Sequence, residues 1–245
     1  GTVCKGLLKE FGINILSYTL QIGNVSANME TVPREKIWHN AEMSYVRCPD
    51  EAASKKMIQL IKKTGAKGDT LGGRFAVTAQ NVPAGLGSHT QWDLKLDGRL
   101  SQSLMSIQAI KAVEFGCASK LASVAGSVSH DEIFYNNKKG FYRNTNRAGG
   151  IEGGISNGEP IEITCTMKAI PSLAKPLRSV NINTKKPVKA EAVRSDVCAV
   201  AAAGVVAEAA VAFELARAMK EKFGGDSLED MKENFRAYIS RIQVI

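Results

Sequence analysis

The apolar run at residues 197–213 limits the possible folds more than any other feature of this sequence. It is rich in alanine, and Glu208 interrupts it. A membrane span needs ~20 strongly apolar residues, so we interpret the run as part of a globular protein. It lies within a predicted helix over residues 196–223, which the glycine pair at residues 224–225 ends.

Helical and strand patterns alternate along the rest of the chain. Apolar residues at helical spacing, or a capping box, predict helices over residues 1–11, 50–64, 93–110 and 227–243. Strand patterns cover residues 13–22, 74–80, 111–115, 161–168 and 179–182. Residues 24–49 look irregular, and the long Gly-rich stretch 116–158 is typical of a functional loop or of a disordered segment. These patterns support an α/β or α+β protein with helices covering one or two layers of sheet.

The charge balance favours an anionic partner. The 245-residue chain has 32 Lys and Arg against 24 Asp and Glu, a net charge of +8. Nucleic acid, an anionic membrane surface and an anionic metabolite all remain open from charge alone. Aromatic residues make up only 6% of the chain. The densest basic stretch is short, with Lys185, Lys186, Lys189 and Arg194, and is typical of a solvated face.

Cysteine and histidine usage argues against disulfide and metal frameworks. The five cysteines are scattered, with no Cys-x-x-Cys pair, as in reduced cytoplasmic proteins. His39, His89 and His130 have no partner at ligand spacing, so we expect no metal site.

Three segments carry candidate site residues. Glycines at residues 153–158 permit close approach of a ligand, or simply form turns. Lys168 ends a strand and precedes a Pro-stiffened turn, which suits a phosphate or an ordinary strand exit. Arg194 precedes the long helix, where Asp196 is either an acid/base group or, with Ser195, a helix cap.

At these segments the sequence resembles the chorismate synthase family. The matching stretches, in family order, are residues 68–73 (GDTLGG), 82–87 (VPAGLG), 91–100 (QWDLKLDGRL), 105–116 (MSIQAIKAVEFG), 145–159 (TNRAGGIEGGISNGE), 168–173 and 194–208 (RSDVCAVAAAGVVAE). The resemblance implies an α+β fold, a four-layer α/β/β/α sandwich with residues 1–245 in one domain, assembled as a homotetramer.

The resemblance also implies an activity. Family members are lyases that convert 5-enolpyruvylshikimate 3-phosphate to chorismate by trans-1,4 elimination of phosphate, using reduced FMN. The resemblance implies a cytoplasmic enzyme of the shikimate pathway, with no nucleic-acid or membrane partner. Some relatives reduce the flavin with NADP-linked chemistry. This chain has no separate nucleotide-binding motif, so we expect reduced flavin to come from elsewhere.

The family's site residues are carried over by position. Asp196 matches the aspartate proposed to work beside the flavin ring. Flavin contacts would fall on Gln108, Ala109, Gly153, Lys168, Ala169, Ile170, Pro171, Ser172 and Arg194. Ala169 and Ala201 stand where relatives often have proline. The loss of proline after Lys168 destabilises that turn by about 0.4–1 kcal/mol through unfolded-state entropy.

The resemblance covers the family's C-terminal two-thirds. The family's N-terminal motifs, including both histidines used for proton transfer, have no counterpart here, so we expect a domain incomplete at its N-terminus. An alternative is therefore a catalytically silent fragment that keeps the fold and part of the flavin site.

Overall fold

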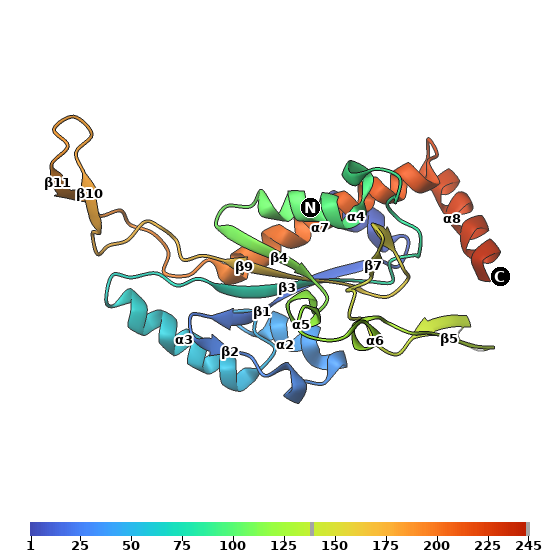
Figure 1. Ribbon diagram of the computed structural model, residues 1–245, viewed down its shortest axis with the longest axis horizontal. Helices are drawn as coiled ribbons and strands as arrows, with labels where there is room; N and C mark the ends of the chain where they lie inside the picture. Colours follow the sequence, from blue (N-terminus) through green and yellow to red (C-terminus); the bar gives the residue numbers. More distant parts are fainter. Residues whose placement is uncertain (138–139, 244–245) are drawn as a thin grey trace.

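A five-stranded antiparallel sheet lies at the centre of this computed structural model, which describes residues 1–137 and 140–243. The strands follow the order β2-β1-β3-β9-β4 (Figure 1). Their bounds are Asn14–Ile22 (β1), Val25–Ser26 (β2), Gly73–Gln80 (β3), Ile110–Phe115 (β4) and Ile161–Met167 (β9). In β9, Ile161, Ile163 and Cys165 are fully buried, and the alternation predicted for this strand is confirmed.

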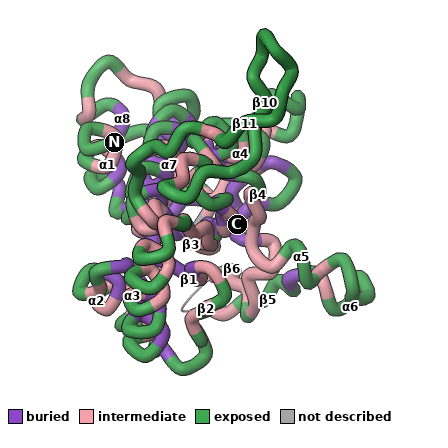
Figure 2. Tube along the Cα trace, turned by 90° about the vertical axis from the view of Figure 1, so that its left-hand side faces the viewer, coloured by how far each residue is buried: buried purple, intermediate pink, exposed green. Residues whose placement is uncertain are grey.

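Helices α1 (Thr2–Lys9), α4 (Leu96–Met105) and α7 (Val200–Phe223) lie along one side of this sheet (Figure 1). Helices α2 (Ile37–Met43) and α3 (Glu51–Gly65) lie beside its β1–β2 edge, where α2 contacts β1 and α3 contacts β2. Helix α7 packs directly on β1 and β3 and also contacts α1 and α4. Figure 2 shows its buried face. Its small residues permit this close packing, since a Cβ at Gly204 would lie 2.8 Å from Ser17 Oγ.

The last helix, α8 (Leu228–Gln243), begins with the predicted capping box. Asp230 N donates to Ser227 Oγ, and Ser227 N donates to Asp230 Oδ2, both at 3.1 Å. The Phe235 ring on α8 packs edge-on against Phe11 and Phe223, with ring centres 5.3 and 5.2 Å apart. Helix α8 is thereby attached to the core.

The predicted functional loop at residues 116–158 consists of short elements. They are α5 (Ala118–Leu121), α6 (Gly126–Ser129), β5 (Ile133–Asn136), β6 (Gly140–Arg143), β7 (Ile151–Glu152) and β8 (Ile155–Ser156). Strands β5 and β6 form one hairpin, and β7 and β8 form another. Three 3-10 turns lie at Met29–Thr31 (η1), Arg34–Lys36 (η2) and Trp92–Leu94 (η3).

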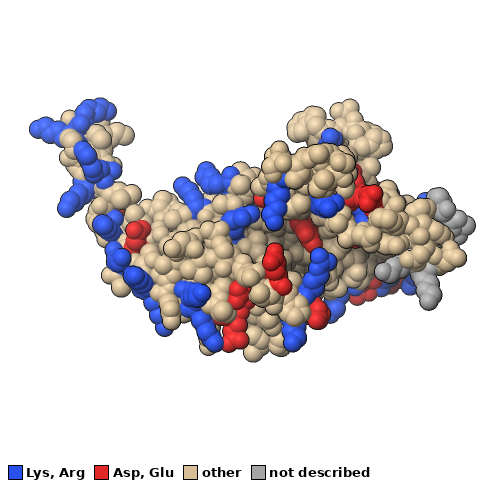
Figure 3. Space-filling model, turned by 60° about the horizontal axis from the view of Figure 1, so that its bottom comes forward, with Lys and Arg blue, Asp and Glu red and all other residues tan. Residues whose placement is uncertain are grey.

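Residues 173–193 leave the body of the molecule as a projecting arm, which we call the basic arm (Figures 1 and 2). It carries the hairpin of β10 (Arg178–Val180) and β11 (Pro187–Lys189). Lysine and arginine side chains cover it in Figure 3. Its apolar side chains also face solvent, with Ile182 79% exposed. The arm is therefore held mainly at its base.

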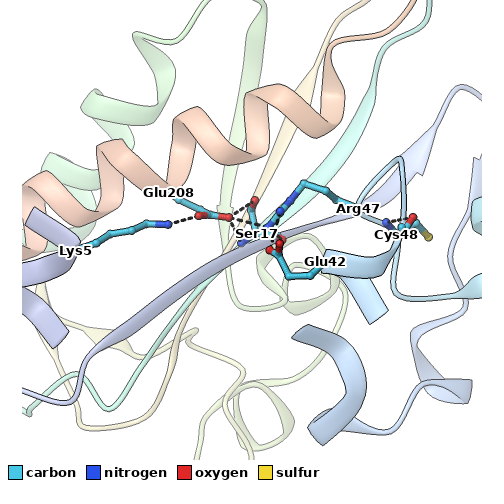
Figure 4. A network of polar contacts seen from close by, with 7 residues as sticks. Lys5, Ser17, Glu42, Arg47, Cys48 and Glu208 are labelled. Carbon is cyan, nitrogen blue, oxygen red and sulfur yellow. Dashed lines mark hydrogen bonds and ion pairs between the residues drawn. The ribbon is translucent and has the colours of Figure 1, made fainter. Parts of the chain in front are cut away.

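A polar network closes the outer edge of β1 (Figure 4). Strand β2 pairs only with residues 21–22, which leaves the earlier part of β1 without a strand on that side. There, Ser17 N donates to Glu208 Oε1 at 2.7 Å, and Thr19 N donates to Arg47 O at 2.8 Å. Arg47 Nη2 donates to Ser17 O at 2.9 Å and to Glu208 Oε1 at 3.0 Å. Side chains and a turn thus satisfy the backbone groups of an edge strand.

The α+β class expected from the resemblance is confirmed. Among the residues described, one five-stranded sheet forms the main layer of strands, and the other strand pairs form two-stranded hairpins. The prediction that residues 24–49 are irregular was wrong for α2. In the described ranges, no helix has both the length and the apolar character of a membrane span.

The long helix begins four residues later than predicted, at Val200 instead of residue 196. Leu71 N donates to Val197 O at 2.7 Å, and Leu71 forms a parallel bridge with Cys198. This pairing holds residues 197–198 against Leu71 in a non-helical conformation, so the helix starts only after them. Its N-cap is Ala199, with no side-chain cap, and the prediction that Ser195 or Asp196 caps the helix was wrong.

Candidate active site

Several chain segments meet beyond the end of β9. They are residues 68–73, 108–110, 168–175 and 194–198. Lys168 N donates to Ala109 O at 2.9 Å, and Ser195 Oγ donates to Ser172 O at 2.5 Å. Except for Gly153, these segments carry all the predicted site residues: Gln108, Ala109, Lys168, Ala169, Ile170, Pro171, Ser172, Arg194 and Asp196.

The charged residues at this place face solvent. Lys168, Arg194 and Asp196 are all exposed. No carboxylate among the described residues lies within ion-pair distance of Lys168 or Arg194. Since Asp196 does not cap the helix, its carboxylate is free of that structural role. Among the predicted site residues, two cations and one carboxylate are therefore available to a ligand.

A cavity of about 270 Å³ opens between the 65–70 turn and the returning segment. Its lining includes Gly68, Asp69, Thr70, Arg194, Ser195 and Val197. Hydroxyl, carboxylate and guanidinium groups thus share one cavity with small and apolar side chains. That mixture suits a ligand with both a charged part and an apolar part.

Backbone geometry at Ala109 is unusual. Its φ of 68° lies in the left-handed region, which non-glycine residues rarely adopt. In this conformation its carbonyl accepts the hydrogen bond from Lys168 N. Gln108, the residue before it, is exposed. The predicted pair of residues 108–109 therefore lies directly beside the predicted lysine.

The structure places Gly153 apart from the others. Gly153 forms the turn of the β7–β8 hairpin with φ 62°. This hairpin is attached elsewhere, because Leu96 N donates to Gly154 O at 2.9 Å. The seven residues of β9 separate the hairpin end from Lys168. At ~3.3 Å per residue, that strand spans roughly 20 Å.

Much of the glycine-rich stretch around residues 145–150 has a structural explanation. Burial alone would raise the pKa of Asp131. Hydrogen bonds from Thr145 Oγ1, Ala148 N and Arg147 N outweigh that effect and lower its pKa. Gly149 then passes so close to Gly116 that a Cβ at Gly149 would lie 2.2 Å from Gly116 N.

Thr70 is a site residue to which sequence reasoning assigned no role. Its Oγ1 donates to Ile170 O at 2.7 Å, and it lines the cavity. The GDTLGG stretch was a visible signal, but nothing in the sequence indicated what it contacts.

Cys198 lies beside the site, and burial raises the pKa of its thiol. Over residues 1–137 and 140–243, no cluster of three metal-ligating side chains is found.

Comparisons with known proteins agree on one family. The sequence profile described as chorismate synthase matches residues 1–219. The chain belongs to the chorismate synthase family. The chorismate synthase of Endomicrobium trichonymphae is 70% identical over 245 residues, which is 100% of this chain and 64% of that protein. The chorismate synthase of Desulforudis audaxviator is 49% identical over 99% of this chain and 62% of its own length.

Solved structures support the same family. A crystal structure of chorismate synthase superposes with a TM-score of 0.84 and 39% identity, covering 99% of this chain and 67% of that one. The chain spans 64% of the length of the Endomicrobium trichonymphae protein and 62% of the length of the Desulforudis audaxviator protein.

Proposed function

We propose that this chain carries the chorismate synthase reaction: trans-1,4 elimination of phosphate from 5-enolpyruvylshikimate 3-phosphate, with reduced FMN. The observation that supports it best is the convergence of Lys168, Arg194 and Asp196 at one end of the sheet, exposed and without ion-pair partners among the residues described. In the elimination, the C–O bond to phosphate and a ring C–H bond break, and a new double bond forms. Phosphate leaves with the C–O electron pair, and the proton passes to a base.

The residues at this place fit an anionic flavin. Lys168 and Arg194 would hold its phosphate or its reduced ring by charge and hydrogen bonds. Gln108, Ala109 and residues 169–172 would supply backbone and small side-chain surface beside them. When bound, reduced FMN supplies the transient reducing power that the elimination requires, although the reaction has no net redox change.

The exposed carboxylate of Asp196 would hold or move a proton at one of its oxygens. Its segment is fixed by the pairing of Leu71 with residues 197–198, so this carboxylate starts from a defined position. Gly153 belongs to the proposal only through the resemblance, because its hairpin is attached at the other end of β9.

The proposal extends to partners and location. The substrate has two carboxylates and a phosphate, which suits a chain with a net charge of +8. The five free cysteines agree with a reducing, cytoplasmic setting. Family membership supports a homotetramer that uses neither nucleic acid nor a membrane.

The test is an anaerobic assay of chorismate formation and phosphate release with reduced FMN and the substrate. We expect turnover that falls about 10²–10⁴-fold in Asp196→Asn, which removes a proton-transfer group. Asp226→Asn is the matched control, because this exposed residue lies beyond the far end of α7. Flavin binding without any turnover would contradict the proposed activity and support the silent-fragment alternative. Absence of flavin binding would contradict the cofactor assignment.

A further inference from the structure

We propose that residues 68–73, here called the clamp, position both halves of the candidate flavin site, and that Thr70 is their positioning residue. The two halves are the outgoing segment, residues 168–175, and the returning segment, residues 194–198. We call these two segments together the stem. The inference rests on the proposed function for its ligand. The contacts themselves are independent of it.

The clamp holds the outgoing half at three successive points. Lys175 N donates to Gly68 O at 3.0 Å, and Thr70 Oγ1 donates to Ile170 O at 2.7 Å. Gly72 lies against the start of this half, since a Cβ there would meet Ala169 N at 2.7 Å. The outgoing segment is therefore held against the clamp near both of its ends.

The clamp holds the returning half from its next residue. Leu71 N donates to Val197 O at 2.7 Å, and Leu71 pairs with Cys198 in a parallel bridge. Thr70 and Leu71 are adjacent, so one short stretch of chain sets the distance between the lysine and arginine halves of the site. The clamp is fixed in turn to the sheet, where Gly23 N donates to Gly72 O at 2.9 Å.

Thr70 is the point at which this arrangement can be tested. Gly68 and Leu71 use backbone atoms, which a substitution leaves in place. Within the part of the chain that the structure describes, the Thr70 hydroxyl is the clamp side-chain group that hydrogen bonds to the stem. Thr70→Val removes this donor at nearly constant shape, and Thr70→Ser keeps it.

The experiment compares Thr70→Val, Thr70→Ser and the matched control Thr31→Val with the unmodified 245-residue chain. Thr31 Oγ1 also donates to a backbone carbonyl, that of Asn28 at 2.8 Å, but in η1 away from the site. Dissociation constants are measured by anaerobic titration with dithionite-reduced FMN. We expect about fivefold weaker binding in Thr70→Val, and unchanged binding in Thr70→Ser and Thr31→Val.

A second readout needs no flavin. Hydrogen exchange of the stem, followed by mass spectrometry, should speed up over residues 168–175 in Thr70→Val alone. Unchanged exchange and unchanged FMN binding in Thr70→Val would overturn the proposal, as would equal losses in Thr70→Val and Thr70→Ser. If Thr70→Val lost its far-UV circular dichroism, Thr70→Ala would replace it, because it adds no apolar atom. An unmodified chain that binds no FMN would contradict the proposed function, while the exchange result would still decide the role of the clamp.

Discussion

Glu208 connects segments that lie far apart in the sequence. Its buried carboxylate accepts hydrogen bonds from Ser17 N at 2.7 Å, Ser17 Oγ at 2.6 Å and Arg47 Nη2 at 3.0 Å, and it also pairs with Lys5 (Figure 4). Removing one charged side chain from a buried ion-pair network leaves its partners buried without an opposite charge. The free-energy cost of that loss exceeds the net stabilisation that the intact network provides.

We therefore expect Glu208→Gln to lower the free energy of unfolding by about 3 kcal/mol. Urea denaturation measures this change. Glu51→Gln is the matched control, because Glu51 pairs with Lys55 at the exposed surface of α3, and exposed ion pairs contribute little to stability. Equal losses in the two variants would show that the network does not stabilise the fold.

The sequence allowed Glu208 to be located but not explained. It stood out as the charge that interrupts an apolar run, and its helix was correctly predicted. Its partners are Lys5, Ser17 and Arg47, which lie far from Glu208 in the sequence. Only folding brings these residues together. The same limit applied to Thr70, whose partner is Ile170. Asp196 was identified as a site residue only through the resemblance, since the residue pattern alone favoured a helix cap.

At the scale of elements, glycine allows α7 to pack closely against the sheet. A Cβ at Gly204 would lie 2.8 Å from Ser17 Oγ and 3.2 Å from Ser17 Cβ, whereas a Cβ at Gly6 in α1 meets nothing within 4 Å. Both glycines lie in helices with ordinary backbone angles. Their environments therefore separate packing from helix propensity.

Gly6→Ala should stabilise the protein by about 0.5–1 kcal/mol, because alanine is the better helix former. Gly204→Ala should instead destabilise it by about 1–3 kcal/mol, because the extra methyl group forces α7 and β1 apart. Thermal unfolding of the two variants side by side gives the sign of each change. A gain in stability at Gly204 would mean that α7 does not pack against Ser17 as described.

Predictions of elements succeeded where local chemistry decides. Asp50 Oδ1 accepts from Ala53 N at 3.0 Å and caps α3 near its predicted start, and Gly224 ends α7 as expected. Predictions of elements failed where a residue far away in the sequence determines the local structure. Leu71 delays the start of α7, and short α2 has too few residues for a clear helical period. The single-domain organisation over residues 1–245 stays a prediction.

At the scale of the whole molecule, the basic arm differs from the rest of the chain. Its hairpin pairs Arg178 with Lys189, which places like charges opposite one another. Two-stranded hairpins are at best marginally stable alone. The body has its own core, which includes Phe75, Leu100 and Leu215. The arm and the body should therefore respond differently to a protease.

Limited trypsin digestion should cut first after Arg178, Lys185 or Lys189, in the exposed arm. The nicked protein should keep its melting temperature, because the arm adds nothing to the core. Mass spectrometry identifies the cuts, and a thermal melt of the nicked sample checks stability. Cleavage after Lys62 or Lys63 in α3 at the same rate would contradict this picture. A variant with Arg178, Lys185, Lys186 and Lys189 changed to Gln is the control.

The position of the arm has a consequence for protein engineering and for evolution. The backbone leaves the stem, passes through the arm and returns, yet the clamp fixes both sides of the stem to the body, and the hydrogen bond from Ser195 to Ser172 joins the two sides to each other. New chain ends, or a whole foreign domain, can therefore be introduced at the tip, between Asn181 and Lys186, without separating Lys168 from Arg194. Insertions of variable length at this tip would change the surface that the protein offers to binding partners. The candidate site at the base of the arm would stay the same.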